Sequence, residues 1–317
     1  MQFERLKERT FTDKWNHFEI KPKKISFFSK ILRITKNYLR KITKVSIQIK
    51  KIDEIIDFSF ENKQIDKILL NKRNLLIEKK INEFLIPFNI KFSKKNLIIY
   101  IKQFHKVYFA SPIRHLGSGI GYNQALLIYI IIKIIKPTDV IESGVMRGFS
   151  SYIIDKALEK NSKIHCYDIS FSKLIYRSAK ASYCENDISN NFPKFKGKKI
   201  LALYDDHVSH LDRLQLSQKL KIKYNIFDDD LNFFNIHSDG WPPLPTLNML
   251  INFKRLKFKK KNNFKWVSQS RIGKINFKIF EKDFFNKKQY KYNLFPDLFD
   301  ITGYRNHGQT SFLILQK

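Results

Sequence analysis

The chain has 317 residues, a formal net charge of +31 and a sequence pI of about 9.9. This length predicts one large domain, or one domain with an extension. The two cysteines, Cys166 and Cys184, exclude a disulfide framework or a cysteine metal cluster and suit a reducing compartment. The longest apolar run, Ala125 to Ile135, contains Lys133 and is too short to span a bilayer.

The excess of positive charge has two explanations. A strongly basic protein often binds nucleic acid or an anionic surface. Here Lys far outnumbers Arg, while Ile, Asn, Phe and Tyr are abundant and Gly and Pro are scarce, which is typical of an AT-rich coding sequence. Lys is also a poorer bidentate phosphate ligand than Arg. We favour the compositional explanation, so nucleic acid is the less favoured partner.

The first 95 residues are predicted to form a basic, mostly helical extension of a main domain at 96–317. Residues 21–50 carry ten basic and no acidic side chains, interleaved with apolar ones. Such a helix can lie on an anionic membrane or along RNA. The favoured alternative is a solvated helix packed on the main domain. Residues 53–92 continue with helical periodicity, broken at Pro87.

A glycine-rich loop precedes a predicted buried helix at Tyr122 to Ile135. The loop, His115 to Asn123, resembles a phosphate-binding loop, but no buried strand precedes it and no Lys-Ser/Thr pair follows. We interpret Gly117 to Tyr122 as a flexible loop with hinge glycines, or equally as a plain structural turn.

The most informative stretch runs from Asp139 to Ser151. Val140 and Ile141 end an apolar strand, and Glu142 lies at its tip. Gly144 and Gly148 then mark a turn, and Ser150 and Ser151 are expected to cap a helix from Tyr152 to Lys160. A strand, a glycine turn and a helix in this order predict the nucleotide-binding half of a doubly wound α/β sheet.

The pattern Glu142-x-Gly144-x-x-x-Gly148-x-Ser150 resembles the first motif of class I S-adenosylmethionine-dependent methyltransferases. It is most similar to the metal-assisted O-methyltransferases, the catechol and macrocin types among them. Met146 stands where a dinucleotide-binding enzyme usually has another glycine. The resemblance implies a Rossmann-like, seven-stranded sheet with an antiparallel last strand. It also implies that Glu142, Gly144, Gly148 and Ser150 bind S-adenosylmethionine.

The pattern of strand and helix then repeats along the chain. A strand at Lys163 to Tyr167 ends at Asp168, which is placed to bind a ribose diol. We expect a helix at Phe171 to Tyr183 and a second one at Ser209 to Leu220. Further strands are predicted at Lys199 to Tyr204, followed by Asp205-Asp206-His207, and at Lys223 to Phe227, followed by Asp228-Asp229-Asp230.

Five aspartates are therefore expected at one edge of the sheet, where open α/β sheets bind ligands. Their mutual repulsion favours a cation with oxygen ligands, most simply Mg²⁺. The resemblance implies that Asp206, Asp228 and Asp229 bind the metal and that His207 lies beside the adenine. Whether Asp205 or Asp206 is the ligand stays open. Asp206, His207 and His210 are the candidates for proton transfer.

The carboxy-terminal part is expected to complete the sheet. Asp300 to Tyr304 and Thr310 to Leu315 resemble its sixth and seventh strands, and Phe264 to Ile279 alternates like an exposed strand or a hairpin. His237 and Trp241, in a proline-rich loop, either cover the acceptor or form a structural turn. A second basic run covers residues 254–265.

The resemblance to metal-assisted O-methyltransferases implies an enzyme that methylates a hydroxyl of a small polyol, sugar or glycan, using S-adenosylmethionine and Mg²⁺. The metal would lower the pKa of the hydroxyl. The start, Met1 to Arg5, is polar, so we expect a cytoplasmic protein, associated with the inner membrane face if residues 21–50 bind lipid. One alternative is a cephalosporin-hydroxylase-like enzyme, which would need iron and histidine ligands. The other is an RNA- or membrane-binding protein with a degenerate methyltransferase domain.

Overall fold

The computed structural model describes residues 11–12, 18–22, 67–114, 119–195, 197, 199–234, 236, 243–253, 263–267, 271–276, 289–305 and 308–316. The predictions for residues 23–50, for Gly117, for His237 and Trp241 and for residues 254–262 lie outside these ranges.

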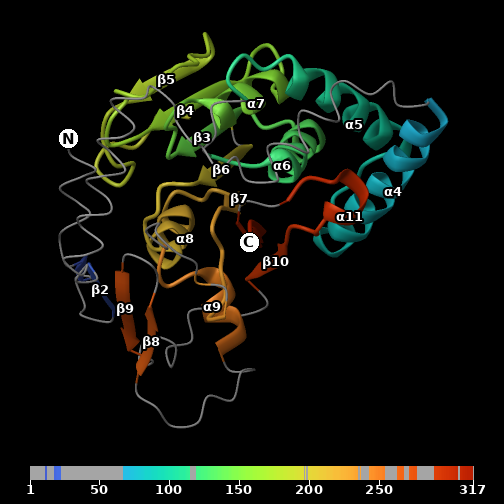
Figure 1. Ribbon diagram of the computed structural model, residues 1–317. Coiled ribbons are helices and arrows are strands. Elements are labelled where there is room, and N and C mark those ends of the chain that lie inside the picture. Colours follow the sequence, from blue (N-terminus) through green and yellow to red (C-terminus); the bar gives the residue numbers. More distant parts are fainter. Residues whose placement is uncertain are drawn as a thin grey trace, which may run out of the picture.

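A seven-stranded sheet forms the centre of the molecule, in the order β10-β11-β7-β6-β3-β4-β5 (Figure 1). Neighbours from β7 through β5 run parallel, whereas β11 is antiparallel to both β7 and β10. This confirms the predicted Rossmann-like fold with its antiparallel last strand. The strands are β3 (Asp139–Ser143), β4 (Lys163–Tyr167), β5 (Ala181–Cys184), β6 (Ile200–Tyr204), β7 (Tyr224–Phe227), β10 (Tyr290–Leu294) and β11 (Ser311–Leu315).

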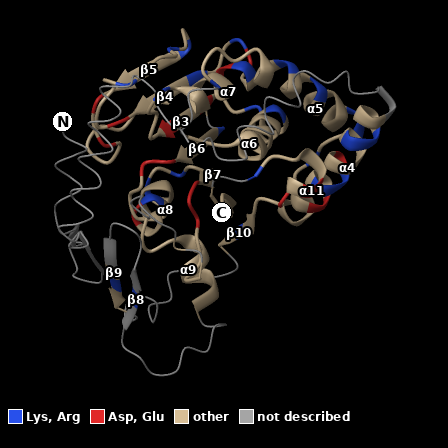
Figure 2. Ribbon diagram, in the orientation of Figure 1, with Lys and Arg blue, Asp and Glu red and all other residues tan. Residues whose placement is uncertain are grey.

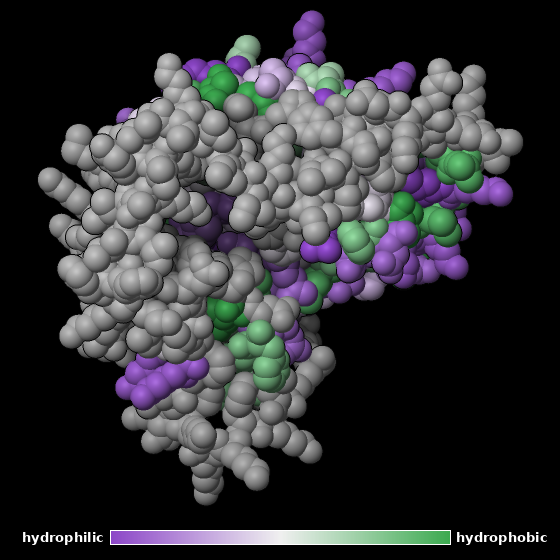
Figure 3. All heavy atoms as spheres, in the orientation of Figure 1, coloured by the Kyte–Doolittle hydropathy of each residue, from purple (hydrophilic) through white to green (hydrophobic). Residues whose placement is uncertain are grey.

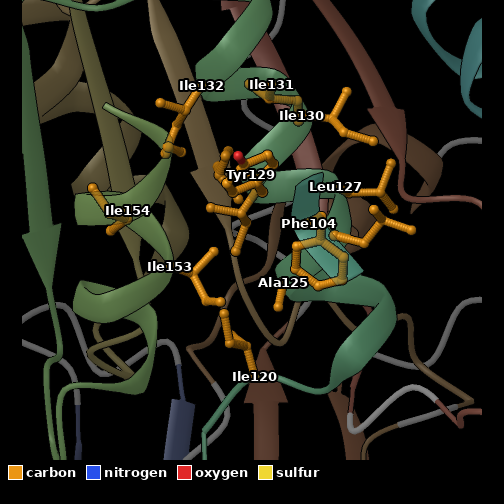
Figure 4. Close-up of a cluster of buried hydrophobic side chains, with 14 of the residues drawn as sticks. Phe104, Ile120, Ala125, Leu127, Tyr129, Ile130, Ile131, Ile132, Ile153 and Ile154 are labelled. Carbon is orange, nitrogen blue, oxygen red and sulfur yellow. The ribbon is translucent and has the colours of Figure 1, made fainter. Parts of the chain in front are cut away.

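Helices cover both faces of the sheet because its central strands are apolar on both sides. Val140 of β3 faces a core formed with α4, α5, α6 and α7, whereas its neighbour Ile141 faces a second core formed with α8 and α9. Figure 4 shows part of the first core, around Phe104. The helices are α4 (Lys67–Leu85), α5 (Lys94–Phe109), α6 (Tyr122–Ile135), α7 (Phe149–Ala157), α8 (His210–Lys219), α9 (Leu247–Asn252) and α11 (Phe299–Thr302), with a 3₁₀ turn at Ile86–Phe88.

The amino-terminal helices share their core with the sheet. Ile77 and Ile81 of α4 are fully buried in the same cluster as Ile128 of α6. The expected domain boundary after residue 95 falls inside α5, so we describe α4 together with the main domain. None of the described helices is both long and apolar enough to span a membrane.

A second, smaller sheet has the order β1-β2-β9-β8. It joins β1 (Phe11–Thr12) and β2 (Phe18–Pro22) to β9 (Arg271–Asn276) and β8 (Asn263–Val267). The antiparallel pairing of β8 with β9 agrees with the hairpin, one of the two forms predicted from alternation.

Two predicted elements were wrong. Phe171 to Tyr183 is an extended segment leading into β5, because its backbone bonds elsewhere: the N–H groups of Ile175 and Tyr176 both donate to the carbonyl of Arg147, each at 3.1 Å. The sixth strand is β10, and residues 300–304 instead include most of α11, which ends at Gly303 in a left-handed conformation, φ 77°. A glycine at this position is a helix C-cap signal.

Candidate functional site

The predicted site residues meet at one edge of the central sheet. Ser143 of β3 is in register with Tyr167 of β4 and with Tyr204 of β6, and Tyr204 is in register with Phe227 of β7. Glu142, Asp168 and the aspartates after β6 and β7 lie within three residues of these positions. Figure 2 shows acidic residues, in red, within β3 and in the segments that follow β6 and β7. The four carboxyl ends therefore share one edge, as predicted.

The glycine turn after β3 packs backbone against backbone on the tip of β6. Gly144 has φ +90°, and a Cβ added there would lie 2.1 Å from the carbonyl oxygen of Asp205. Gly148 has φ +88° and would place a Cβ 2.5 Å from the carbonyl oxygen of Tyr176. Both positions therefore require glycine, for conformation and for space. Met146, between them, has φ 48° and a side chain that is 41% exposed.

Asp168 holds this turn in place. Its Oδ2 accepts hydrogen bonds from the backbone N–H groups of Val145 and Met146, at 2.8 and 2.9 Å, and its Oδ1 accepts one from Ser170 at 3.2 Å. The carboxylate expected at the ribose position is thus at the predicted strand tip, next to the glycine turn. Its role toward a ligand stays a prediction.

Glu142 is fully buried beneath the turn. Its Oε2 accepts hydrogen bonds from the Ser151 hydroxyl at 2.6 Å and from the Cys166 thiol at 3.3 Å, whereas its Oε1 has no hydrogen-bond partner among the described residues. Burial raises the pKa of Glu142 to about 7, although neighbouring hydroxyl groups act to lower it. The expected capping by Ser150 and Ser151 was wrong, because the N-cap of α7 is Gly148, which has no side chain to make a cap bond.

The tips of β6 and β7 bring carboxylates against one another. Burial, followed by repulsion from Asp228 and Asp229, raises the pKa of Asp205 well above its usual value. Burial and Asp229 likewise raise the pKa of Asp228 to about 7. Asp228 Oδ1 accepts hydrogen bonds from Gln124 Nε2 at 2.9 Å and from the Thr310 hydroxyl at 2.5 Å. The carboxyl groups at these two tips would therefore repel one another if all were ionised, which favours their protonated forms.

Asp206, in contrast, is paired with a buried arginine. Its Oδ2 accepts a hydrogen bond from Arg213 Nε at 2.8 Å, and its Oδ1 accepts one from the N–H of Val208 at 3.0 Å. Arg213 also donates from Nη1 to Asp187 Oδ1 at 3.1 Å. Although burial acts to raise it, the Arg213 guanidinium lowers the pKa of Asp187 to about 2. Arg213 thus ties the loop after β5 to the tip of β6.

The two candidate histidines differ in accessibility. His207 has φ 56° and a side chain that is 38% exposed, with its Nδ1 3.7 Å from Asp229 Oδ2. His210 is buried, and its Nε2 bonds to the carbonyl oxygen of Asp228 at 2.9 Å. Asp230 is also buried and bonds to the N–H of Asn248 in α9, at 2.8 Å. His207 is therefore the histidine that can meet a substrate, whereas His210 and Asp230 have structural partners.

The predicted metal ligands do not form a metal site as arranged. Within the part of the chain that the structure describes, no group of three or more His, Cys, Asp or Glu side chains could hold a metal ion. Asp206 uses both carboxylate oxygens for Arg213 and Val208, and Asp228 uses one for Gln124 and Thr310. The set Asp206, Asp228 and Asp229 thus does not fit a divalent cation in this arrangement.

Sequence reasoning missed Gln124, Thr310 and Arg213. Gln124 is a buried amide in the otherwise apolar run of α6, and an amide there needs partners. Arg213 is an arginine on α8 in a chain whose basic residues are mostly lysine, at a site where a bidentate donor is needed. Both signals were visible, but neither indicates which carboxylate is the partner.

Comparisons with known proteins yield only distant structural likenesses. No family model and no curated protein matches the chain. An O-methyltransferase from Bacillus cereus, in complex with SAH, shares 11% identity, covering 62% of this chain and 96% of that one, with a TM-score of 0.32. A cmcI structure with Mg-SAM shares 10% identity over 62% of this chain and 72% of that one, with a TM-score of 0.36. The chain spans 61% of the length of a second cmcI structure, with SAH, at 12% identity over 34% of this chain and a TM-score of 0.31. Because these identities and TM-scores are so low, the comparisons do not bear on the function of this chain, and the topology described above stands by itself.

Proposed function

We propose that the protein is an S-adenosylmethionine-dependent methyltransferase. The observation that carries the proposal is the strand order, with β11 inserted antiparallel between β7 and β10, combined with the glycine turn at the carboxyl end of β3. This combination agrees with the resemblance of the Glu142 to Ser150 motif to class I methyltransferases. Ligands of open α/β sheets bind at this edge.

The residues at the edge suit such a cofactor. The turn at Gly144 and Gly148 brings the backbone close to the edge, and Asp168 follows on the neighbouring strand, where a ribose diol can bind. Glu142 lies buried beneath the same turn, and its Oε1 has no hydrogen-bond partner within the described part of the chain. The bound cofactor would supply an activated methyl group.

The acceptor that we propose is a hydroxyl of a small polyol, sugar or glycan. Transfer to a hydroxyl requires that its proton be removed. His207 is the accessible base at the tip of β6, and Asp229, 3.7 Å away, is placed to stabilise its protonated ring. Mg²⁺ stays a prediction, and no part of the reaction is assigned to it.

Isothermal titration calorimetry with S-adenosylmethionine and with SAH tests the proposal. We expect binding by the wild type and at least roughly tenfold weaker binding by Asp168→Asn, because a ribose diol binds a carboxylate better than an amide. Asp300→Asn, which changes an exposed aspartate on α11, is the matched control and should bind like the wild type. Absence of heat with both compounds would refute the proposal. Titrations with Mg²⁺ and with EDTA test the metal separately.

A further inference from the structure

The helix α4 carries large apolar side chains on the side that faces solvent as well as on the side that faces the core. Its inner side buries Ile77, Ile81 and Phe84 against the sheet domain. Its outer side exposes three leucines, Leu69, Leu75 and Leu76, by 59%, 54% and 53%. Single exposed leucines need no explanation, but several on one helix mark a contact surface.

Lysines are interleaved with these leucines. Leu69, Lys72, Leu76 and Lys79 follow one another at intervals of three and four residues, so they form one stripe along the helix. Lys80 is also exposed, and Ile86, directly after the helix, is 60% exposed. Figure 3 shows hydrophobic and hydrophilic side chains side by side on the flank that α4 forms.

The neighbouring helix α5 has the same composition on its exposed side. Lys95, Ile99, Lys102, Lys106 and Phe109 are exposed at helical spacing. Residues 67–109 together carry ten basic and two acidic side chains. The α4–α5 hairpin, defined by these residues, therefore exposes large apolar side chains in a strongly positive setting.

We propose that the α4–α5 hairpin binds the surface of an anionic lipid membrane. Lysine ammonium groups attract anionic headgroups, while leucine and isoleucine side chains enter the headgroup boundary. A second copy of the chain fits less well, because two equally basic surfaces repel each other. Nucleic acid would match the lysines but would leave the leucines exposed.

Flotation of the full-length protein with vesicles tests this inference. One set of vesicles contains phosphatidylcholine alone, and the other contains one part phosphatidylserine to two parts phosphatidylcholine. We expect binding to the second set only, and roughly tenfold or more weaker binding by Lys72→Gln/Lys79→Gln/Lys80→Gln. The control Lys160→Gln/Lys173→Gln/Lys221→Gln removes the same charge from exposed lysines elsewhere and should bind like the wild type.

A second variant, Leu75→Gln/Leu76→Gln, tests the apolar part. It should bind more weakly than the wild type, most visibly at high salt, where the lysines are screened. Both α4 variants change exposed side chains, so circular dichroism should show an intact fold. Equal losses in the α4 and control lysine variants would overturn the inference, since net charge alone would then explain binding. A wild-type dimer that Leu75→Gln/Leu76→Gln dissociates would overturn it as well.

Discussion

The carboxylates at the two halves of the sheet edge differ in their hydrogen-bond partners. On β3 and β4, Asp168 accepts hydrogen bonds from backbone N–H groups and Glu142 accepts them from a hydroxyl and a thiol. After β6 and β7, Asp205, Asp228 and Asp229 repel one another, whereas Arg213 pairs with Asp206. The first half is therefore organised by the chain itself, whereas the second keeps a charge that protons or a ligand must balance.

The largest effect is expected at the contact between the two halves. Gly144→Ala would place a methyl group 2.1 Å from the Asp205 carbonyl oxygen and force an unfavourable φ. We expect the free energy of unfolding to fall by more than about 4 kcal/mol, or the protein not to fold. Gly119→Ala is the control, because Gly119 has a similar φ of +94° but no atom of the described residues within 4 Å of the added Cβ. This control variant should lower the free energy of unfolding, measured with urea, by about 1 kcal/mol. Equal losses of unfolding free energy in the two variants would contradict the close packing of Gly144 on the Asp205 backbone.

The second largest effect is expected at the ion pair between Asp206 and Arg213. Arg213→Met leaves Asp206 and Asp187 without their guanidinium partner, and we expect a loss of about 3 kcal/mol in the free energy of unfolding. Adding Asp206→Asn to this variant should restore part of the loss, because it removes one of the unpaired charges. Chemical denaturation of both variants checks this. Additive losses would show that the two residues act independently.

The third effect is a pH dependence. Glu142 and Asp228 have pKa values of about 7 in the folded protein, against about 4 in an unfolded chain. The folded state therefore keeps protons that the unfolded state loses, so the free energy of unfolding is highest below about pH 4 and falls as the pH rises to about 7. The ion pair between Asp187 and Arg213 has the opposite pH dependence. Its contribution to the free energy of unfolding is lost as the pH falls from about 4 to 2.

Glu142→Gln should remove its share of this slope. Between pH 5 and pH 8 the free energy of unfolding of the wild type should fall by about 3 kcal/mol more than that of the variant, because the glutamine side chain cannot ionise. Urea unfolding at several pH values measures the difference. Asp300→Asn, on the exposed side of α11, should keep the wild-type slope. A wild-type stability that does not change over this range would contradict the raised pKa values.

The sequence predicted the strands β3, β4, β6, β7 and β11 and their tips well, because apolar runs and glycine turns are local signals, but it did not predict β5 or β10. It placed Glu142, Asp168, Asp206 and Asp228 at one edge, since parallel strands end on the same side. It could not predict that Arg213 would pair with Asp206, because this contact depends on how α8 packs on the sheet. It misassigned Phe171 to Tyr183 because the bonds that hold this segment extended come from Arg147, on a different loop.

The position of β11 also constrains how the chain can fold during synthesis. It is the last of the seven strands along the sequence, yet it lies inside the sheet, and among the described strands it is the only neighbour of β10. Until the ribosome has released β11, the hydrogen-bonding edge of β7 stays open and β10 has nothing to pair with. A nascent chain stalled at this stage would expose a template for aggregation, so chaperone binding is expected to concentrate in this interval.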